Sequence, residues 1–128
     1  MSEPLRLVGF FRELRHGRPD GPSLRQAVHA EADIDEARVV EYLRSGSTIT
    51  VAGRLTSDVL SGSPDAVLPL GVLTDGVWIW PADLEYYVEQ YHARLPSEFL
   101  EHAKRLEWRP PVLSEGQLGD LIAKFPKD

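Results

Sequence analysis

The amino-acid sequence contains no cysteine and a single methionine among its 128 residues. The absence of cysteine excludes disulfide bonds and thiolate metal sites. The first 20 residues also lack an uninterrupted hydrophobic segment, because charged residues such as Arg6, Arg12 and Glu13 separate the apolar ones. We find no signal for secretion or membrane insertion there, and we therefore expect a cytoplasmic protein.

Basic residues are in the minority. The chain has 14 Lys and Arg against 20 Asp and Glu, which gives a net charge of -6 and a pI near 5.2. Proteins that bind a phosphate backbone usually carry a basic surface, so this balance argues against a nucleic-acid partner. The same charge would attract a basic protein partner.

The length and composition fit one folded domain. A chain of 14.3 kDa buries roughly two thirds of the surface that its unfolded form exposes, which allows a core to form without disulfides. The content of 42% hydrophobic and 27% charged residues is that of an ordinary globular protein. We therefore expect residues 1–128 to form a single domain.

Common catalytic signatures are absent. The sequence contains no Gly-x-Ser-x-Gly motif and no glycine-rich loop with the spacing that holds nucleotide phosphates. Two pairs, Glu13 with His16 and Glu89 with His92, have the Glu-x-x-His spacing of di-metal bundles. On a helical wheel both pairs point away from the apolar face, whereas the ligands of such a centre point inward. We therefore predict no metal and no cofactor.

Helical spacing dominates the first 46 residues. The pattern predicts a helix over residues 5–16, which would end before Gly17. Its buried face would consist of Leu7, Phe10, Phe11 and Leu14. A short helix capped by Ser23 and a longer one after Asp33 follow, the latter ending near Gly46. Their inward residues would be Leu24, Ala27 and Val28, and then Ala37, Val40 and Leu43.

Strand signals begin at residue 47. Residues 48–51 alternate between polar and β-branched apolar side chains, and residues 67–73 form a second strand in which Pro69 favours the sheet edge. The pair Asp75-Gly76 separates this strand from the apolar run 77–80. An Asp-Gly pair between apolar runs is a strong hairpin signal, so we place a tight turn there, with Gly76 at positive φ.

Helical patterns return after Pro81. The first, over residues 84–91, precedes a second that begins at Pro96 and a third that begins with a capping box of Ser114 and Gln117. In the second helix, Glu98 and His102 are expected to form a surface pair. Together these elements predict an α+β fold: a small antiparallel sheet of about three strands, flanked by N-terminal and C-terminal helices.

Aromatic residues are concentrated in this region. Trp78 and Trp80 share one face of their strand, because side chains alternate across a sheet. Two alternatives follow: both tryptophans are buried under helices, or their face meets a partner. Tyr86 lies opposite the apolar stripe of its own helix, so we expect its ring to be exposed.

The same region carries a resemblance. The run from Leu73 to Tyr91, followed by residues 95–99, resembles the signature LTDGxWxWPxDLxYYVExY…LPxEF of small uncharacterised bacterial proteins. Some of those proteins resemble immunity or accessory proteins encoded beside toxins. The resemblance implies an interaction protein and no catalytic residues.

Two hypotheses for function remain. The first is a non-catalytic protein-protein interaction domain of the immunity type, with its surface formed by Asp75, Trp78, Trp80, Asp83 and Tyr86. The second is a small-molecule-binding domain or enzyme with a pocket between sheet and helices. Its polar groups would be Asp83, His92 or the loop residues His16, Arg18 and Asp20. A pocket holding a histidine within hydrogen-bonding reach of a carboxylate would favour this second hypothesis.

Overall fold

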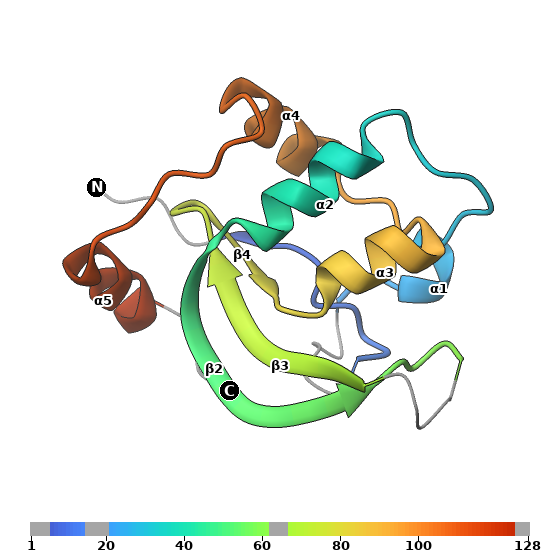
Figure 1. Cartoon of the computed structure of the whole chain (residues 1–128), viewed down its shortest axis with the longest axis horizontal. Coiled ribbons are helices and arrows are strands. Elements are labelled where there is room, and N and C mark those ends of the chain that lie inside the picture. Colours follow the sequence, from blue (N-terminus) through green and yellow to red (C-terminus); the bar gives the residue numbers. More distant parts are fainter. Residues whose placement is uncertain (1–5, 15–20, 62–66, 125–128) are drawn as a thin grey trace.

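Four strands form one sheet in the computed structural model, which describes residues 6–14, 21–61 and 67–124 (Figure 1). The strands are β1 (Arg6–Leu7), β2 (Ser47–Ser57), β3 (Val67–Thr74) and β4 (Trp78–Pro81), in the order β1-β4-β3-β2. β2, β3 and β4 are antiparallel neighbours, and β1 is parallel to β4. The α+β class is confirmed, with a mixed sheet of four strands instead of an antiparallel sheet of three.

The predicted helix over residues 5–16 is wrong. The described part of this segment contains strand β1 and then a turn at Gly9, whose φ of +80° interrupts any helix. A Cβ atom at Gly9 would lie 2.5 Å from a methyl group of Leu84, so the chain passes directly over this side chain. The apolar spacing reflects a segment that lies across the core, in which the buried side chains are Val8, Phe10, Phe11 and Leu14.

Five helices occur in the described residues: α1 (Leu24–Ala27), α2 (Glu36–Arg44), α3 (Leu84–Tyr91), α4 (Ser97–Arg105) and α5 (Glu115–Lys124). Ser23 caps α1 as predicted, and the capping box of Ser114 and Gln117 at α5 is also confirmed. Ala37, expected to face inward, is exposed on α2. The side chains that α2 buries are Val39, Val40, Tyr42 and Leu43. None of the helices in these ranges is both long and apolar enough to cross a bilayer.

The predicted hairpin joins β3 to β4 through residues 75–77. The Asp75 carboxylate closes this turn, because its Oδ1 accepts hydrogen bonds from the main-chain N–H groups of Val77 and Trp78, at 2.9 and 2.7 Å. Gly76 has a φ of +99°, as expected. Pro69 pairs opposite Leu55 on an inner strand, but β4 reaches only as far as residue 72, so this part of β3 has a strand partner on one side.

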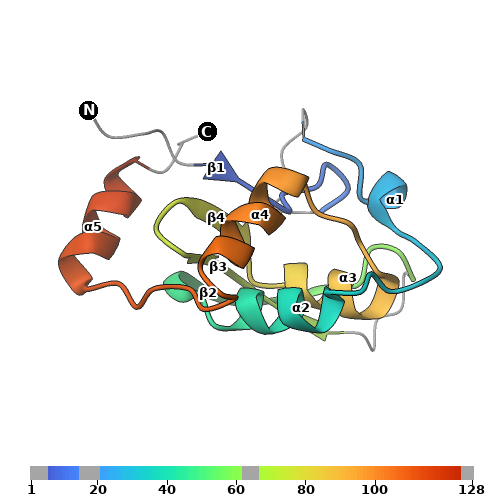
Figure 2. The same cartoon turned by 90° about the horizontal axis from the view of Figure 1, so that it is seen from above.

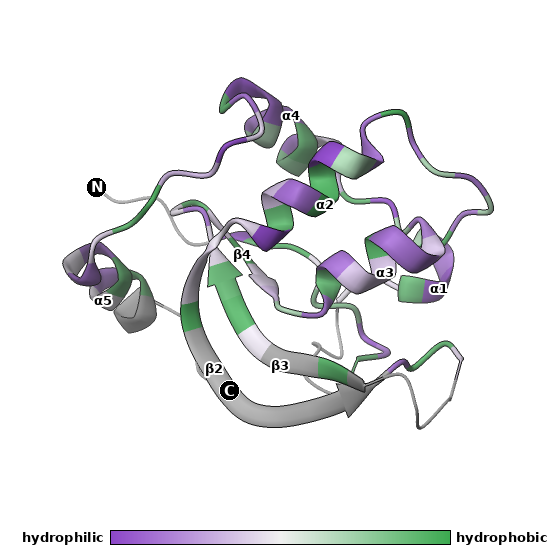
Figure 3. Ribbon diagram, viewed as in Figure 1, coloured by the Kyte–Doolittle hydropathy of each residue, from purple (hydrophilic) through white to green (hydrophobic). Residues whose placement is uncertain are grey.

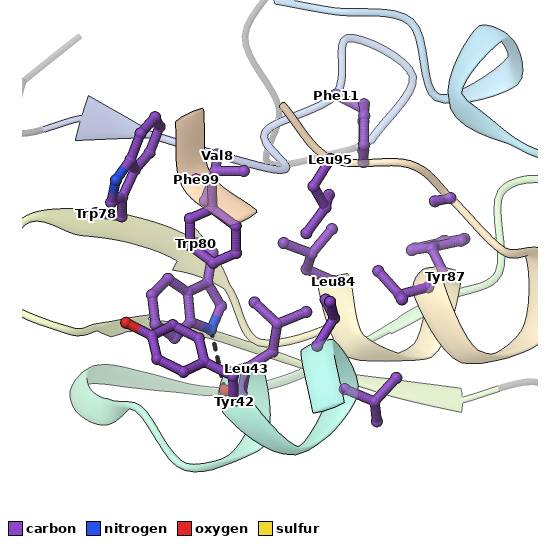
Figure 4. Close-up of a cluster of buried hydrophobic side chains, with 14 of the residues drawn as sticks. Val8, Phe11, Tyr42, Leu43, Trp78, Trp80, Leu84, Tyr87, Leu95 and Phe99 are labelled. Carbon is purple, nitrogen blue, oxygen red and sulfur yellow. Dashed lines mark hydrogen bonds between the residues drawn. The ribbon is translucent and has the colours of Figure 1, made fainter. Parts of the chain in front are cut away.

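The core lies where α2, α3 and α4 meet β4 and the N-terminal segment (Figures 1 and 2). The helices carry both hydrophobic and hydrophilic residues along their length, as amphipathic helices do (Figure 3). Phe99 sits at the centre and packs edge-on against Tyr42, Trp78 and Trp80, with ring centroids 5.8, 5.5 and 5.8 Å away (Figure 4). α5 lies apart from the other helices in both views.

Candidate functional site

Most of the residues proposed for a binding surface lie inside the protein. Trp78 and Trp80 are 6% and 1% exposed, and both contact Phe99 of α4. Asp75 and Asp83 are also buried. The structure therefore places the tryptophans in the core, the first of the two alternatives, because helix α4 covers their face of the sheet.

Tyr86 is half-buried, which corrects the expectation of an exposed ring. Its ring packs edge-on against Tyr87 and Tyr91, with centroids 5.3 and 6.2 Å away. Its hydroxyl donates a 2.6 Å hydrogen bond to Oδ2 of the buried Asp58. The helical wheel missed this contact because Asp58 follows β2, 28 residues earlier in the chain.

Asp58 is the centre of a saturated hydrogen-bond cluster. Tyr86 and Tyr91 donate to Oδ2, and the main-chain N–H groups of Leu60 and Ser61 donate to Oδ1. Burial by itself raises the pKa of Asp58, but these four hydrogen bonds outweigh it and lower the pKa below its usual value. The same bonds to Asp58 raise the pKa of Tyr86 and Tyr91. The cluster joins the loop after β2 to α3 and presents no accessible base.

A second buried carboxylate, Asp75, has a histidine beside it. Its Oδ2 accepts a 2.5 Å hydrogen bond from the Tyr42 hydroxyl, in addition to the two main-chain donors at Oδ1. Nε2 of His102 on α4 lies 3.3 Å from the same Oδ2. Burial and the bond to Asp75 raise the pKa of Tyr42, so its hydroxyl remains the donor. The expected surface pair of Glu98 and His102 is therefore wrong, because His102 turns toward the hairpin.

A pocket of about 320 Å³ opens beside this pair, between the β1-β4 edge of the sheet and α4. Its side chains include Arg6, Trp78, Glu98, Glu101, His102 and Arg105, and we call it the His102 pocket. The four members from α4 share one helix face, since they are three or four residues apart. Arg6 pairs with Glu98 at 3.0 Å and lies over the Trp78 ring at 5.4 Å.

A second cavity of similar size, about 330 Å³, lies between the N-terminal segment, the start of α1 and residues 94–96. Its lining is mainly apolar. The Ser23 hydroxyl donates to Glu13, and Arg94 lies 3.5 Å from Asp33, so both polar side chains in this wall already have partners. The His102 pocket therefore has the stronger case for polar recognition.

The other predicted candidates have structural roles. Glu13 accepts hydrogen bonds from the main-chain N–H groups of Leu24 and Arg25, and so caps α1. His92 ends α3 with a φ of 55°, and its Nδ1 lies 2.8 Å from Glu36. In the part of the chain that the structure describes, no group of three His, Asp or Glu side chains is arranged so that it could hold a metal ion. The loop candidates His16, Arg18 and Asp20 lie outside the described residues.

Sequence reasoning missed the pairing of His102 with Asp75. The two residues are 27 positions apart in the chain, and the sequence predicts Asp75 only as a turn residue and as part of an exposed binding surface. The signal that could have found the pocket is the charged face of α4, where Glu98, Glu101, His102 and Arg105 recur at helical spacing. Such a face on a short helix is usually solvated, so the pattern alone did not single it out.

Known proteins give no indication of the function of this chain, so its function is inferred from the geometry of the structure. The chain matches no protein-family model, and no significant match is found among curated proteins or solved structures.

Proposed function

We propose that this protein binds a small polar molecule with an anionic group in the His102 pocket. The single observation that carries this proposal is the placement of His102, 3.3 Å from the buried Asp75 carboxylate, in the wall of a pocket between sheet and helix. The proposal takes up the second hypothesis from the sequence, a ligand pocket between sheet and helices, with other polar groups than those expected there.

Two arginines and two glutamates line the pocket, and Arg6 is already paired with Glu98, so Arg105 is the group that supports an anionic ligand. Arg105 has no ion-pair partner among the described residues, so its guanidinium is available to a carboxylate or phosphate group. His102 adds a second donor when it is protonated. Trp78 gives the pocket an apolar surface for the rest of the ligand, and the volume is at the lower end of the range for small-molecule sites.

The proposal is tested by titrating ¹⁵N-labelled protein with acetate and with inorganic phosphate, and following amide and indole resonances by NMR. We expect shifts that saturate and are confined to α4 and residues 77 and 78. Arg105→Ala should weaken binding about tenfold, the effect of about 1.4 kcal/mol in binding free energy. The control is Arg25→Ala, an exposed arginine on α1, which should bind as the parent does. Equal affinity in the Arg105 and Arg25 variants, or no saturable shifts, would contradict the proposal.

One observation favours a second candidate function, the binding of a basic protein. Ile34 is 94% exposed on the loop before α2, where Glu31, Asp33 and Asp35 surround it in sequence. An exposed isoleucine among carboxylates suits an interface that combines an apolar anchor with charge attraction. The resemblance to immunity-type proteins points in the same direction.

This candidate is tested by affinity capture with two charge-introducing variants. Ile34→Asp should lose a basic protein that the parent captures in stoichiometric amount. Val112→Asp is the matched control, because Val112 is also 94% exposed but lies far along the chain, between α4 and α5. Capture that is equal in both variants would count against Ile34 as an anchor.

A further inference from the structure

We propose that His102 is a general base that activates a water molecule in its pocket for the hydrolysis of a small carboxylic ester, with Asp75 as its positioning residue. This inference rests on one part of the proposed function, the binding of a small molecule in the His102 pocket, because the ester must occupy that pocket; it does not require the ligand to carry an anionic group. It assigns to the site an activity in addition to binding.

The first support is the way the carboxylate is held. Asp75 has no exposed side-chain surface, and it receives hydrogen bonds from the N–H groups of Val77 and Trp78 and from the Tyr42 hydroxyl. Such donors stabilise a buried negative charge and fix its orientation. A fixed carboxylate beside an imidazole selects the tautomer that carries the proton on the facing nitrogen.

The second support is the state of the two ring nitrogens of His102. Nε2 is enclosed, has no hydrogen-bond partner in the described structure and lies 3.3 Å from Asp75 Oδ2. Nδ1, in contrast, is not one of the buried nitrogen atoms that lack a hydrogen-bond partner. The His102 side chain lies in the pocket wall and keeps 19% of its surface exposed. With the proton on Nε2, Nδ1 carries the lone pair of a base. Positive charge on the ring would be attracted by the Asp75 carboxylate, so this contact would tighten into a hydrogen bond in the transition state.

The third support is the composition of the pocket. No serine, threonine or lysine is among its described lining residues, so the group that loses a proton is a water molecule instead of a side-chain nucleophile. Water attacks the ester carbonyl carbon as its proton passes to Nδ1, and the negative charge on the carbonyl oxygen faces Arg105. The carbon-oxygen bond to the alcohol then breaks, and the imidazolium returns the proton to the leaving oxygen. The products are a carboxylic acid and an alcohol, and no cofactor is consumed.

A purely structural role is the competing explanation, in which the Asp75–His102 contact only anchors α4 to the hairpin. The two roles differ in their pH dependence, since only a base requires neutral His102 for turnover. The titratable or charged groups around His102 come from every element packed against it: Arg6, Tyr42, Asp75, Glu98, Glu101 and Arg105. Tyr42 is the most informative, because its hydroxyl shares Oδ2 with the histidine.

The test measures hydrolysis of 4-nitrophenyl acetate by the full chain, after subtraction of the spontaneous rate. We expect His102→Gln to lower kcat/KM at least tenfold, and His29→Gln, which removes an exposed imidazole on the loop after α1, to leave it unchanged. The rate should rise with pH and then level off, as the base becomes neutral. Tyr42→Phe keeps the ring volume but removes a donor from Oδ2, so the midpoint of this profile should move to higher pH.

Three results would overturn the inference. They are equal losses in the two histidine variants, a parent rate no greater than that of free imidazole at the same concentration, and an unshifted pH profile in Tyr42→Phe. Circular dichroism melts of each variant show whether the fold is retained. If His102→Gln does not fold, the pH profile of Tyr42→Phe still tests the inference. If the anion titration succeeds while hydrolysis does not depend on His102, the binding function stands and the activity fails. If hydrolysis depends on His102 but acetate and phosphate do not bind, the activity stands and the anion assignment fails.

Discussion

The indole Nε1 of Trp80 donates a 3.1 Å hydrogen bond to the main-chain oxygen of Leu43, joining β4 to the last turn of α2 (Figure 4). The chain leaves α2 directly beside this ring. A Cβ atom at Gly46 would lie 2.5 Å from Cζ2 of Trp80 and 3.2 Å from the main-chain oxygen of Thr74. Gly46 therefore serves as a point of close approach between the helix end, the indole and the sheet.

Gly46→Ala should lower the free energy of unfolding by about 1–3 kcal/mol, because the added methyl group must displace a rigid, fully buried ring. Urea denaturation followed by tryptophan fluorescence measures this change. The matched control is Gly119→Ala in α5, where a Cβ atom meets nothing within 4 Å. This control should be neutral or up to about 1 kcal/mol more stable, since alanine favours a helix. Unchanged stability in Gly46→Ala would contradict the close approach.

Gly76→Ala should cost about 1 kcal/mol through backbone strain. A φ of +99° is unfavourable for an L-residue with a β-carbon, whereas space is not limiting, because the new methyl would lie 3.6 Å from Leu113. Asparagine adopts positive φ more readily, so Gly76→Asn should lose less stability than the alanine variant. Thermal unfolding of the two variants provides the comparison. A larger loss for asparagine would show that contacts of the side chain, and not the dihedral angle, decide the cost.

Glu13 should make the free energy of unfolding depend on pH in the acidic range. Burial alone raises the pKa of its carboxyl, but hydrogen bonds from the N–H groups of Arg25 and Leu24 and from the Ser23 hydroxyl bring the pKa down to about 2, from 4.5 in an unfolded chain. Because the folded pKa is the lower one, the carboxylate stabilises the fold above pH 4.5, and this contribution disappears as the pH falls toward 2.

The measurement compares the free energy of unfolding of the parent and of Glu13→Gln between pH 2 and 7. The difference should be constant and in favour of the parent near neutral pH, and it should shrink as the pH falls through the window set by the two pKa values. A difference that grows in acid would reverse the sign and contradict the capping role of Glu13.

Tyr86→Phe should lower the free energy of unfolding by about 1.5–3 kcal/mol. The substitution keeps the ring contacts with Tyr87 and Tyr91 and removes only the 2.6 Å hydrogen bond to the Asp58 carboxylate. This replaces the expectation that Tyr86 lies on the solvent side of its helix. Chemical denaturation measures the loss, and a double variant with Asp58→Asn should lose less than the sum of the two single losses. Strict additivity would mean that the hydroxyl and the carboxylate do not interact.

Features that depend on neighbouring residues could be predicted from the sequence. The hairpin at Asp75-Gly76, the cap at Ser23 and the capping box at Ser114 are correct because each arises from dihedral preferences and hydrogen bonds within a few residues. The α+β class follows from the change between helical and strand periodicity. The N-terminal segment was misassigned because a loop lying across a core can bury residues at the same spacing as a helix.

Only the tertiary structure decided which polar groups meet. Asp58 and Tyr86, and likewise Asp75 and His102, come from different elements, so no local pattern in the chain records that they lie side by side. Trp78 and Trp80 were correctly assigned to one face of a strand, but whether that face meets a helix or a partner depends on where α4 packs. The sequence therefore determined the elements from α1 onward and most of their apolar faces, and the packing of α4 on β4 decided that the tryptophans form the core and that His102 lines a pocket.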